Sequence, residues 1–491
     1  MLRQFRVRQL RGDAPTARPK VVLARRGDGL GERLNALLNA MRLAEILDVD
    51  FRFTWPSGRV DKDPSHAITA AEEFFSAEFM AAHHVDHAES KIGYALPAGP
   101  DDDLDSLRAQ LAAAEHGLLA SNHPLRRWID PEAVPAITRG FATEFSSVGF
   151  HPRIDAAIAA ARSIPLDNPT VGIHLRAGDN LFGRYRTWTR FWNKAVPVPV
   201  ARALIERFRR EGQDVLVFGQ DTAIIAELCA TTGAIDAATL RPSGRGRRAA
   251  GDEQQGLSAP EEAMFDLVLM SRCRRIISGW SGFAIQAASL ADKSVESHFD
   301  LVRPQEAIDI IEQDIAQYGD RYDPAHRAFA WWFAYYAARD ELSVDTSILL
   351  VEKALDADPT NPRYRLRVAA LHYRNSDIDR GDDALLGALE ADVGTGDKTL
   401  ESVLLFSLLT VTGYDSEEIF DDIERGARDG PGPAHLYRAA LRAQRGDADG
   451  SAEDLAAFRA SIAGEPWWDD AADAAAAGTV EHRLRRAGRT G

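Results

Sequence analysis

The chain has 491 residues, which is too long for one hydrophobic core and predicts two or three domains. Apolar residues make up 45% of it and charged residues 27%, a globular composition that excludes a largely disordered chain. The formal net charge of −16 argues against a general nucleic-acid binder, because binding the phosphate backbone needs clustered Lys and Arg. A local basic pocket for a small anion remains compatible with this charge.

Cysteine usage and the absence of long apolar runs bear on the compartment. Cys229 and Cys273 are the two cysteines, which argues against a disulfide scaffold or a cysteine zinc site and fits a reducing compartment. The amino terminus is basic but has no apolar segment of the kind found in secretory leaders. No apolar run approaches the length of a membrane span. We therefore expect a cytoplasmic protein without an integral membrane segment.

The amino-terminal part opens with a βαβ pattern. Residues 21–24 predict a short buried strand, and a loop follows with glycines at alternate positions. Apolar residues then recur at helical spacing over 34–47, and residues 51–55 predict the next strand. This arrangement puts the loop at the carboxyl end of a strand, where α/β proteins bind ligands. The loop differs from the dinucleotide-binding pattern because Glu32 takes the place of its third glycine, and a tight turn without a ligand is the alternative. The loop glycines are Gly27, Gly29 and Gly31.

Residues 56–153 are less regular, and we expect short helices and polar turns there. One helix should run to Ala82 behind Thr69, whose spacing to Glu72 fits a capping box. Another should span residues 104–114 behind an acidic start. Three nearby histidines have a spacing that metal ligands can have, but no acidic partner at helical spacing accompanies them. We expect surface histidines and no metal site. These are His83, His84 and His87.

A second buried strand, at residues 171–175, ends in a cluster of polar residues. This pattern is typical of a parallel strand whose carboxyl end delivers side chains to a crevice. Arg176 is the residue of most interest, because a guanidinium can hold phosphate oxygens in a bidentate way. The alternative is an ordinary surface Arg in a solvated turn. His174, Gly178 and Asp179 complete the cluster.

Two cationic segments follow. An aromatic and basic arm could line a sugar or nucleotide pocket, or could pack between domains; it contains Phe182, Arg184, Tyr185, Arg186, Trp188, Trp192 and Lys194. Residues 241–256 predict a loop that could close over an anionic ligand or could be a surface insertion. Its cations are Arg241, Arg245, Arg247 and Arg248.

Two further strands end in polar residues. Residues 215–218 lead to Asp221, and residues 275–278 lead through a Gly-rich turn to Ser281 and a helix from Phe283. Unpaired amides at a helix N-terminus favour a bound phosphate, whereas plain N-capping by the serine is the alternative. In a parallel sheet the ends that carry Arg176, Asp221 and Ser281 reach one edge. The sequence therefore predicts a shared anion-binding crevice.

From about residue 308 onward, Ala- and Leu-rich helical segments replace the strands. Residues 354–358 recur as 388–392 with a period of 34, which is expected of tetratricopeptide-like helix pairs. A third unit is blurred around residues 434–460. Such a region could bind an acceptor or a protein partner, or could stabilise the α/β part.

Three motifs resemble the fucosyltransferase superfamily, which includes the α-1,2- and α-1,6-fucosyltransferases, the nodulation fucosyltransferase and the protein O-fucosyltransferases. Residues 27–35 are similar to its amino-terminal glycine loop, and residues 174–179 match the H-x-R-x-x-D core of its donor motif. Residues 266–273, followed by 276–283, resemble its D-L-x-L-M-S-x-C segment with the serine turn. Ala177 differs, because many members carry a second Arg there.

The resemblance implies a GT-B-like fold class: α/β, with a pair of Rossmann-like domains, followed here by an all-α tetratricopeptide-like domain. We expect an acceptor-side domain at 1–155, a donor-binding domain at 156–310 and the helical domain at 311–491. The implied activity is an inverting, metal-independent glycosyl transfer without a cofactor. Its donor is a nucleotide sugar, best assigned as GDP-fucose, and its acceptor is a hydroxyl of a glycan, a protein or a small molecule.

The resemblance also implies roles for individual residues. Arg176 would neutralise the leaving diphosphate together with the amides of the serine turn. His174 and Asp221 would contact guanine, whose paired N–H donors suit a carboxylate. Asp28 and Glu32 are the candidate catalytic bases, and Asp179 is a third. The implied donor-binding set is Gly29, Gly31, His174, Arg176, Asp179, Asp221, Ser281, Gly282 and Phe283.

Two alternatives remain open. The chain could be a nucleotide-binding adaptor of the tetratricopeptide type without catalysis, or a transferase that uses another nucleotide sugar. Arg176, Asp221 and Ser281 together favour an enzyme, whereas Ala177 in place of an arginine leaves the adaptor open.

Overall fold

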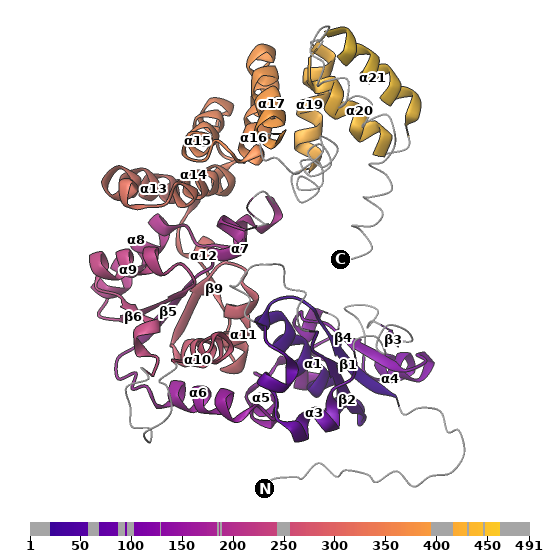
Figure 1. Cartoon of the computed structure of the whole chain (residues 1–491), viewed down its shortest axis with the longest axis vertical. Helices are drawn as coiled ribbons and strands as arrows, with labels where there is room; N and C mark the ends of the chain where they lie inside the picture. Colours follow the sequence, from indigo (N-terminus) through magenta and orange to yellow (C-terminus); the bar gives the residue numbers. More distant parts are fainter. Residues whose placement is uncertain are drawn as a thin grey trace.

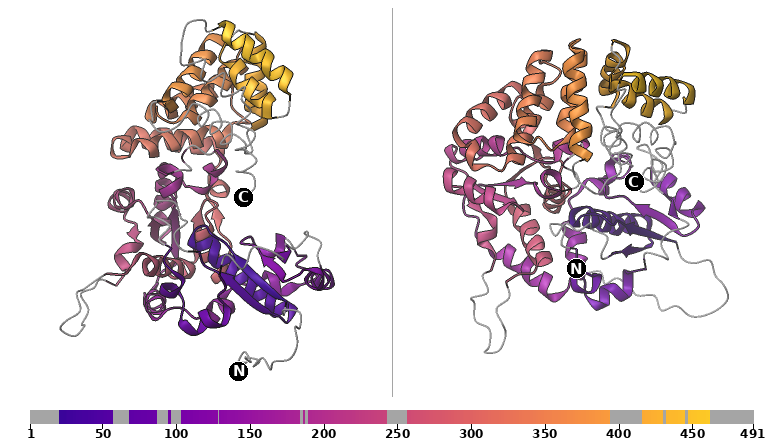
Figure 2. Two further views of the ribbon diagram at one scale, coloured as in Figure 1. Left: turned by 45° about the vertical axis from the view of Figure 1, so that its right-hand side comes forward. Right: turned by 45° about the horizontal axis from the view of Figure 1, so that its top comes forward.

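The computed structural model describes residues 20–56, 68–86, 94–95, 103–127, 129–183, 186, 189–242, 256–393, 416–429, 432–444 and 447–461. Two α/β parts, each with one parallel sheet, are followed by a region of helices. Figure 1 shows the first part in indigo and purple, the second beside it in magenta to rose, and the orange and yellow helices extending from the second. The two views in Figure 2 show the same arrangement. The expected succession of two parallel α/β parts and a helical region is therefore present.

The first sheet has the strand order β2-β1-β4-β3, with all neighbours parallel. Helix α1, Leu30–Leu47, links β1 to β2 and is buried along most of its length, because apolar residues face both the sheet and the neighbouring helices. The predicted βαβ opening is confirmed. The strands are β1 Val21–Arg25, β2 Asp50–Thr54, β3 Tyr94–Ala95 and β4 Gly117–Ala120.

The predicted helix from Thr69 to Ala82 is wrong. Two short helices replace it, α2 Ala71–Phe74 and α3 Ala77–His83, and the residue at the N-cap of α2 is Ala70. The chain is extended at Phe75 because consecutive aromatic rings, Phe74 and Phe75, are both buried in a cluster with Trp55 and Phe150. A continuous helix would separate adjacent side chains by about 100°. The predicted helix behind the acidic start is confirmed as α4, Leu104–Ala113.

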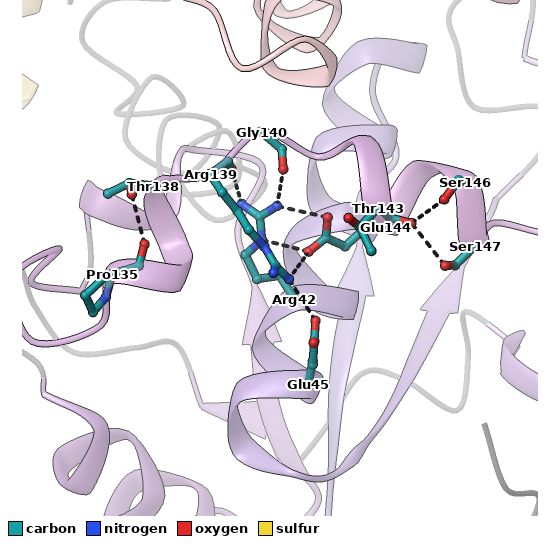
Figure 3. Close-up of polar contacts among 10 residues, drawn as sticks. All are labelled: Arg42, Glu45, Pro135, Thr138, Arg139, Gly140, Thr143, Glu144, Ser146 and Ser147. Atoms are coloured by element: carbon teal, nitrogen blue, oxygen red, sulfur yellow. Dashed lines mark hydrogen bonds and ion pairs between the residues drawn. The ribbon is translucent and has the colours of Figure 1, made fainter. Parts of the chain in front are cut away.

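A buried ion pair joins α1 to the helix α5, Ala142–Ser147. Figure 3 shows Arg42 between the Glu144 carboxylate and the backbone of residues 139–140. Its Nε and Nη2 atoms lie 2.9 Å from the two carboxylate oxygens, and its remaining donors reach the carbonyls of Arg139 and Gly140 at 2.6 and 2.7 Å. The side chains of Arg42 and Glu144 are 1% and 4% exposed. This pair fixes the segment that leads into the second α/β part.

The second sheet has the order β7-β6-β5-β8-β9 and is also entirely parallel. Alternate residues along its strands face two different hydrophobic clusters, as the pleat requires. Leu216, Phe218 and Ile276 pack with α10 and α11, whereas Val215 and Val217 pack with α8 and α9. The strands are β5 Thr170–Leu175, β6 Asp214–Gly219, β7 Ile235–Asp236, β8 Arg275–Ser278 and β9 Glu296–Ser297. The main helices are α6 Pro152–Ser163, α8 Val198–Arg210, α9 Thr222–Thr232, α10 Ala259–Arg272 and α11 Gly282–Leu290, with short α7 Gly178–Leu181 and α12 His298–Leu301.

Helices pack against their sequence neighbours throughout the carboxyl-terminal region. Residues 354–358 cover the end of α15 and the residue after it, and residues 388–392 lie in α17; the tetratricopeptide assignment stays a prediction. The proposed domain limits at 155 and 310 fall inside α6 and α13. Within the described ranges, no helix combines the length and apolarity needed to cross a membrane. The helices are α13 Pro304–Tyr318, α14 Pro324–Ala338, α15 Val344–Ala357, α16 Pro362–Arg374, α17 Ile378–Val393, α19 Ser416–Asp429, α20 Ala434–Gln444 and α21 Ala448–Ser461.

Candidate functional site

In each sheet the strand order reverses at one place, the topological switch point, where the chain goes on to add strands on the other side of the first strand; we call this place the reversal. In the first sheet it lies between β1 and β4, and in the second between β5 and β8. Ligands of open α/β sheets bind in the crevice outside the carboxyl ends of the strands at such a reversal. The glycine loop follows β1, and Arg176 and Ser281 follow β5 and β8. The topology therefore puts the predicted motifs at the two reversals.

The two reversals adjoin each other through the first turns of α1 and α11. A Cβ atom added at Gly31 would lie 2.7 Å from the backbone of Gly282 and Phe283, so only glycine allows this approach. A Cβ added at Gly282 would in turn overlap the Glu32 carboxylate. The glycine loop and the serine turn, which the sequence predicted separately, are thus in contact across the two α/β parts.

His174 and Arg176 lie at the end of β5. The His174 ring is buried, its Nδ1 lies 3.4 Å from Ser278 Oγ on β8, and its centroid is 5.5 Å from that of Phe283. Burial, followed by the charge of Arg176, lowers the pKa of His174 to about 3. The imidazole is therefore neutral near pH 7, and the cationic group at this strand end is the half-buried Arg176.

Ser281 stands at the N-cap of α11, but its side chain caps nothing. The residue is fully buried, and its Oγ has no hydrogen-bond partner among the residues that the structure describes. Plain N-capping, the alternative weighed for this serine, is not what the structure shows. The first intrahelical bond runs from Ile285 N to Ser281 O at 2.9 Å, so the three preceding amides have no partner within the helix. These donors suit an anion.

Asp221 follows β6, the neighbour of β5 on the side away from β8. Its Oδ1 accepts the Ile224 amide at 3.2 Å and so caps α9, while Oδ2 lies 2.8 Å from Nε2 of His326 on α14. The hydrogen bond from His326 is the main reason that the pKa of Asp221 lies below its usual value. The carboxylate is ionised at neutral pH and can still accept a hydrogen bond, because its two oxygens offer four lone pairs in all.

The acidic residues of the glycine loop are held by neighbours. Asp28 forms an ion pair with Arg26, and its carbonyl accepts Arg33 Nε at 2.6 Å. Glu32 accepts a hydrogen bond from Asn122, which follows β4. Glu32 also contacts the serine turn, through Gly282. Asp179 lies in α7, but its side chain falls outside the described part of the chain.

The aromatic and basic arm packs between parts of the molecule where it is described. Arg186 pairs with Asp358 and with Thr360 at the start of the turn between α15 and α16. The Trp192 ring lies 4.1 Å from that of Tyr336 and 5.0 Å from that of Phe299. Interdomain packing is thus observed for these two residues. Arg184, Tyr185 and Trp188 fall outside the described residues.

Other cationic and histidine segments do not add to the site. Arg241 pairs with Glu262 and Asp266 on α10, while Arg245, Arg247 and Arg248 lie outside the described residues, as does His87. The His83 ring stacks on Phe51 with centroids 4.0 Å apart. In the ranges that the structure covers, no three His, Cys, Asp or Glu side chains are grouped to hold a metal ion.

Sequence reasoning missed Asn122 and His326. The four-residue strand before Asn122 is too short to give a clear periodic pattern, and His326 lies 105 residues beyond Asp221 in a segment read only as helical. Contacts of this separation depend on how the helices dock, which no local pattern specifies.

Comparison with known proteins gives distant structural matches. No family model matches the sequence, and no curated protein matches it. The chain is similar to fucosyltransferase NodZ from Bradyrhizobium with a TM-score of 0.32 and 14% identity, over 55% of this chain and 93% of NodZ. For an Arabidopsis thaliana FUT1 mutant in complex with GDP the TM-score is 0.34 and the identity 11%, over 56% of this chain and 70% of that one. For POFUT1 in complex with GDP-fucose the TM-score is 0.29 and the identity 13%, over 58% of this chain and 98% of that one.

Proposed function

We propose that the chain is an inverting, metal-independent glycosyltransferase that moves a sugar, best assigned as fucose from GDP-fucose, to a hydroxyl group. The observation that carries the proposal is the meeting of the two sheet reversals. There a cationic side chain, Arg176, and a buried serine at a helix N-terminus, Ser281, lie at adjacent strand ends opposite the glycine loop. This combination suits a diphosphate.

In the proposed reaction the acceptor oxygen attacks the anomeric carbon of the donor, and the bond from that carbon to the β-phosphate oxygen breaks. The bonding electrons leave with the nucleoside diphosphate, which gains negative charge. Arg176 and the first amides of α11 would stabilise this charge, a task that other transferases give to a metal ion. Attack from the face opposite the leaving group inverts the anomeric configuration.

The acceptor hydroxyl loses its proton as the new bond forms, and Glu32 is the best-supported candidate to accept it. Its carboxylate contacts Gly282 at the serine turn, and Asn122 holds one of its oxygens. Asp28 and Asp179 are the other candidates. A carboxylate in such a position would increase the nucleophilicity of the hydroxyl in the transition state.

Asp221 is proposed to select the base. Guanine presents N1–H and N2–H side by side, and an ionised carboxylate is the natural acceptor for such a pair of donors. Adenine presents no such pair on the corresponding edge. This reasoning favours GDP over ADP as the nucleotide part of the donor.

Thermal shift measurements with GDP, UDP and ADP test the donor site. Stabilisation by GDP, and weaker or no stabilisation by the other two, is expected, because a ligand that binds only the folded state raises the melting temperature. No shift with any nucleotide would overturn the donor site, and a shift with UDP alone would remove the fucose assignment while leaving a transferase.

Release of GDP from GDP-fucose then separates a transferase from an adaptor. With a panel of glycan, peptide and small-molecule acceptors, acceptor-dependent GDP release is expected of a transferase. Tight GDP binding without release of GDP from GDP-fucose under any condition would favour the nucleotide-binding adaptor. The carboxyl-terminal helices are proposed to contact an acceptor or a protein partner.

A further inference from the structure

One helix of the carboxyl-terminal region reaches the carboxyl end of the second sheet. His326 lies in the first turn of α14, and its Nε2 is 2.8 Å from Oδ2 of Asp221. The residue is 5% exposed, so the contact is shielded from water. A helix that follows both sheets in the chain therefore supplies the immediate neighbour of the carboxylate assigned to base selection.

The Asp221 carboxylate is held at both oxygens. Oδ1 accepts the Ile224 amide and Oδ2 faces His326, so the carboxylate plane cannot turn without losing one of the two hydrogen bonds. The side chain nevertheless remains 19% exposed, and the lone pairs that His326 and the backbone amides of Ala223 and Ile224 do not use can accept a hydrogen bond from a ligand. A fixed, partly exposed carboxylate is preorganised for a ligand with two parallel donors.

The imidazole is itself fixed by its surroundings. Asp323 caps α14 through the Ala325 amide at 2.8 Å, and the aromatic residues that follow in the helix are buried against the second sheet and neighbouring helices. The ring of Phe182, at the end of α7, meets His326 edge-on with centroids 5.5 Å apart. Phe182 is 49% exposed, which leaves an aromatic surface beside the imidazole.

We propose that His326 is a positioning residue for the donor base: it holds Asp221 in the orientation that accepts two N–H donors of a guanine nucleotide, so that the helical region completes the donor site. Phe182 adds an accessible ring against which a purine can pack. The inference rests on the proposed function and assigns the helical region a part in nucleotide selection.

A purely structural tie between α9 and α14 would use the same contact, and the chain offers a matched control for it. His435 on α20 pairs with Asp454 on α21, with Nδ1 3.0 Å from Oδ1; both residues are buried, and Arg438 also donates to this carboxylate. This pair lies in the hydrophobic cluster formed by the last helices and not at a sheet edge. Breaking either pair can affect stability, but only loss of the His326–Asp221 pair should affect nucleotide binding.

The test compares full-length wild type, His326→Met, His326→Gln and His435→Met by calorimetric titration with GDP and with ADP. His326→Met should weaken GDP binding at least tenfold and reduce the ratio of GDP to ADP affinity. His326→Gln, whose Nε2 can donate from nearly the same position, should restore most of that ratio. His435→Met should lower the melting temperature and leave both affinities within a factor of two.

If the ratio of GDP affinity to ADP affinity is the same in wild type and His326→Met, the inference is overturned while the donor site stands. Wild type that binds neither nucleotide would overturn the proposed function and this inference together. Should His326→Met fail to fold, nitrogen-15 histidine spectra of the wild type provide the same test, with the signal assigned through His326→Gln. The Nε2 resonance of His326 should move when GDP binds, and an unchanged resonance at saturating GDP would overturn the inference.

Discussion

The two sheet reversals lie opposite each other but differ in how they use their polar groups. Beside β1 and β4, Asp28 pairs with Arg26, and Glu32 accepts from Asn122. Beside β5 and β8, the Ser281 hydroxyl is buried with no partner among the described residues, and the neighbouring imidazole is neutral. Buried polar groups in proteins are nearly always hydrogen-bonded, and the exceptions call for an explanation.

This difference separates a framework from a binding edge. The first reversal pairs the carboxylates of Asp28 and Glu32 within the chain, although Nη2 of the buried Arg33 has no partner among the described residues, and glycine there serves the close approach of two helices. At the second, the Ser281 hydroxyl and the first amides of α11 are the donors proposed to hold a diphosphate. The same α/β topology can therefore supply either role, and side chains rather than strand order decide which one is taken.

The largest expected effect is on the framework side, at the buried pair of Arg42 and Glu144. Arg42→Met leaves the buried Glu144 carboxylate with only the half-exposed Arg139, 3.1 Å away, as an ionic partner and should destabilise the fold by about 3 kcal/mol. Chemical denaturation measures this loss. Arg108→Met, which breaks an exposed pair with Asp105, is the control and should change stability by less than about 1 kcal/mol. Equal effects of the two variants would contradict the framework role.

The same pair should make stability depend on acidity. Burial raises the pKa of Glu144, but hydrogen bonds from Arg42 and the charges of Arg42 and Arg139 outweigh this and bring it below its usual value. The contribution of ionised Glu144 to the stability of the fold is therefore fully present above the ordinary carboxylate pKa. It is lost as the pH falls through the lower pKa that Glu144 has in the folded protein. Arg42→Met leaves burial as the main influence on the pKa of Glu144, opposed only by Arg139, and should weaken or reverse this dependence in denaturation curves measured across the acidic range.

On the proposed binding edge, Arg176→Ala should lower GDP-fucose turnover by about two orders of magnitude or more, because the donor proposed for the leaving diphosphate is lost. The fold should remain stable. Arg275→Ala is the matched control, since Arg275 begins β8 at the opposite end of the same sheet and pairs with Glu296. Turnover that falls equally in both variants would show that the effect is not specific to the carboxyl edge.

Gly31→Ala tests the contact between the two reversals. The new methyl group would lie 2.7 Å from backbone atoms of Gly282 and Phe283, which cannot move aside as a side chain can, and the expected destabilisation is about 1–3 kcal/mol. Gly256→Ala introduces a methyl group with no atom within 4 Å and serves as the control. Melting curves that coincide for Gly31→Ala and wild type would refute the close approach.

The smallest effect concerns His174. Because its pKa in the folded protein is about 3, the unfolded chain binds more protons than the folded one between that value and the ordinary 6.5. Stability should therefore decrease as the pH falls, by about 0.7 kcal/mol between pH 7 and pH 6. The pH dependence of unfolding for His174→Gln and for the control His116→Gln measures this. If stability still decreases with falling pH in His174→Gln, other groups cause the decrease. One such group is buried His298, whose pKa is lowered to about 4 by burial.

The sequence was informative where a local pattern specifies the structure. Strands β1, β5, β6 and β8 are apolar runs that end in polar clusters, and each was predicted with its boundary correct to about one residue. The motifs at their ends followed from the rule that parallel strands share a carboxyl edge. The break at Phe75, the short strand before Asn122 and the pairing of His326 with Asp221 were not predictable. They result from packing between segments far apart in the chain, which leaves no periodic signal.

The placement of the second sheet has a consequence for how the chain can be divided. One face of this sheet belongs to the hydrophobic cluster that includes β1, α1 and α6, and the other face belongs to the cluster that includes α13 to α16. A fragment cut at residues 156 and 310 would keep α8 to α11 on the sheet but would lose the apolar partners that both clusters take from outside these limits. Deletion of either neighbour should therefore yield an aggregating polypeptide, and the three parts should unfold in one calorimetric transition.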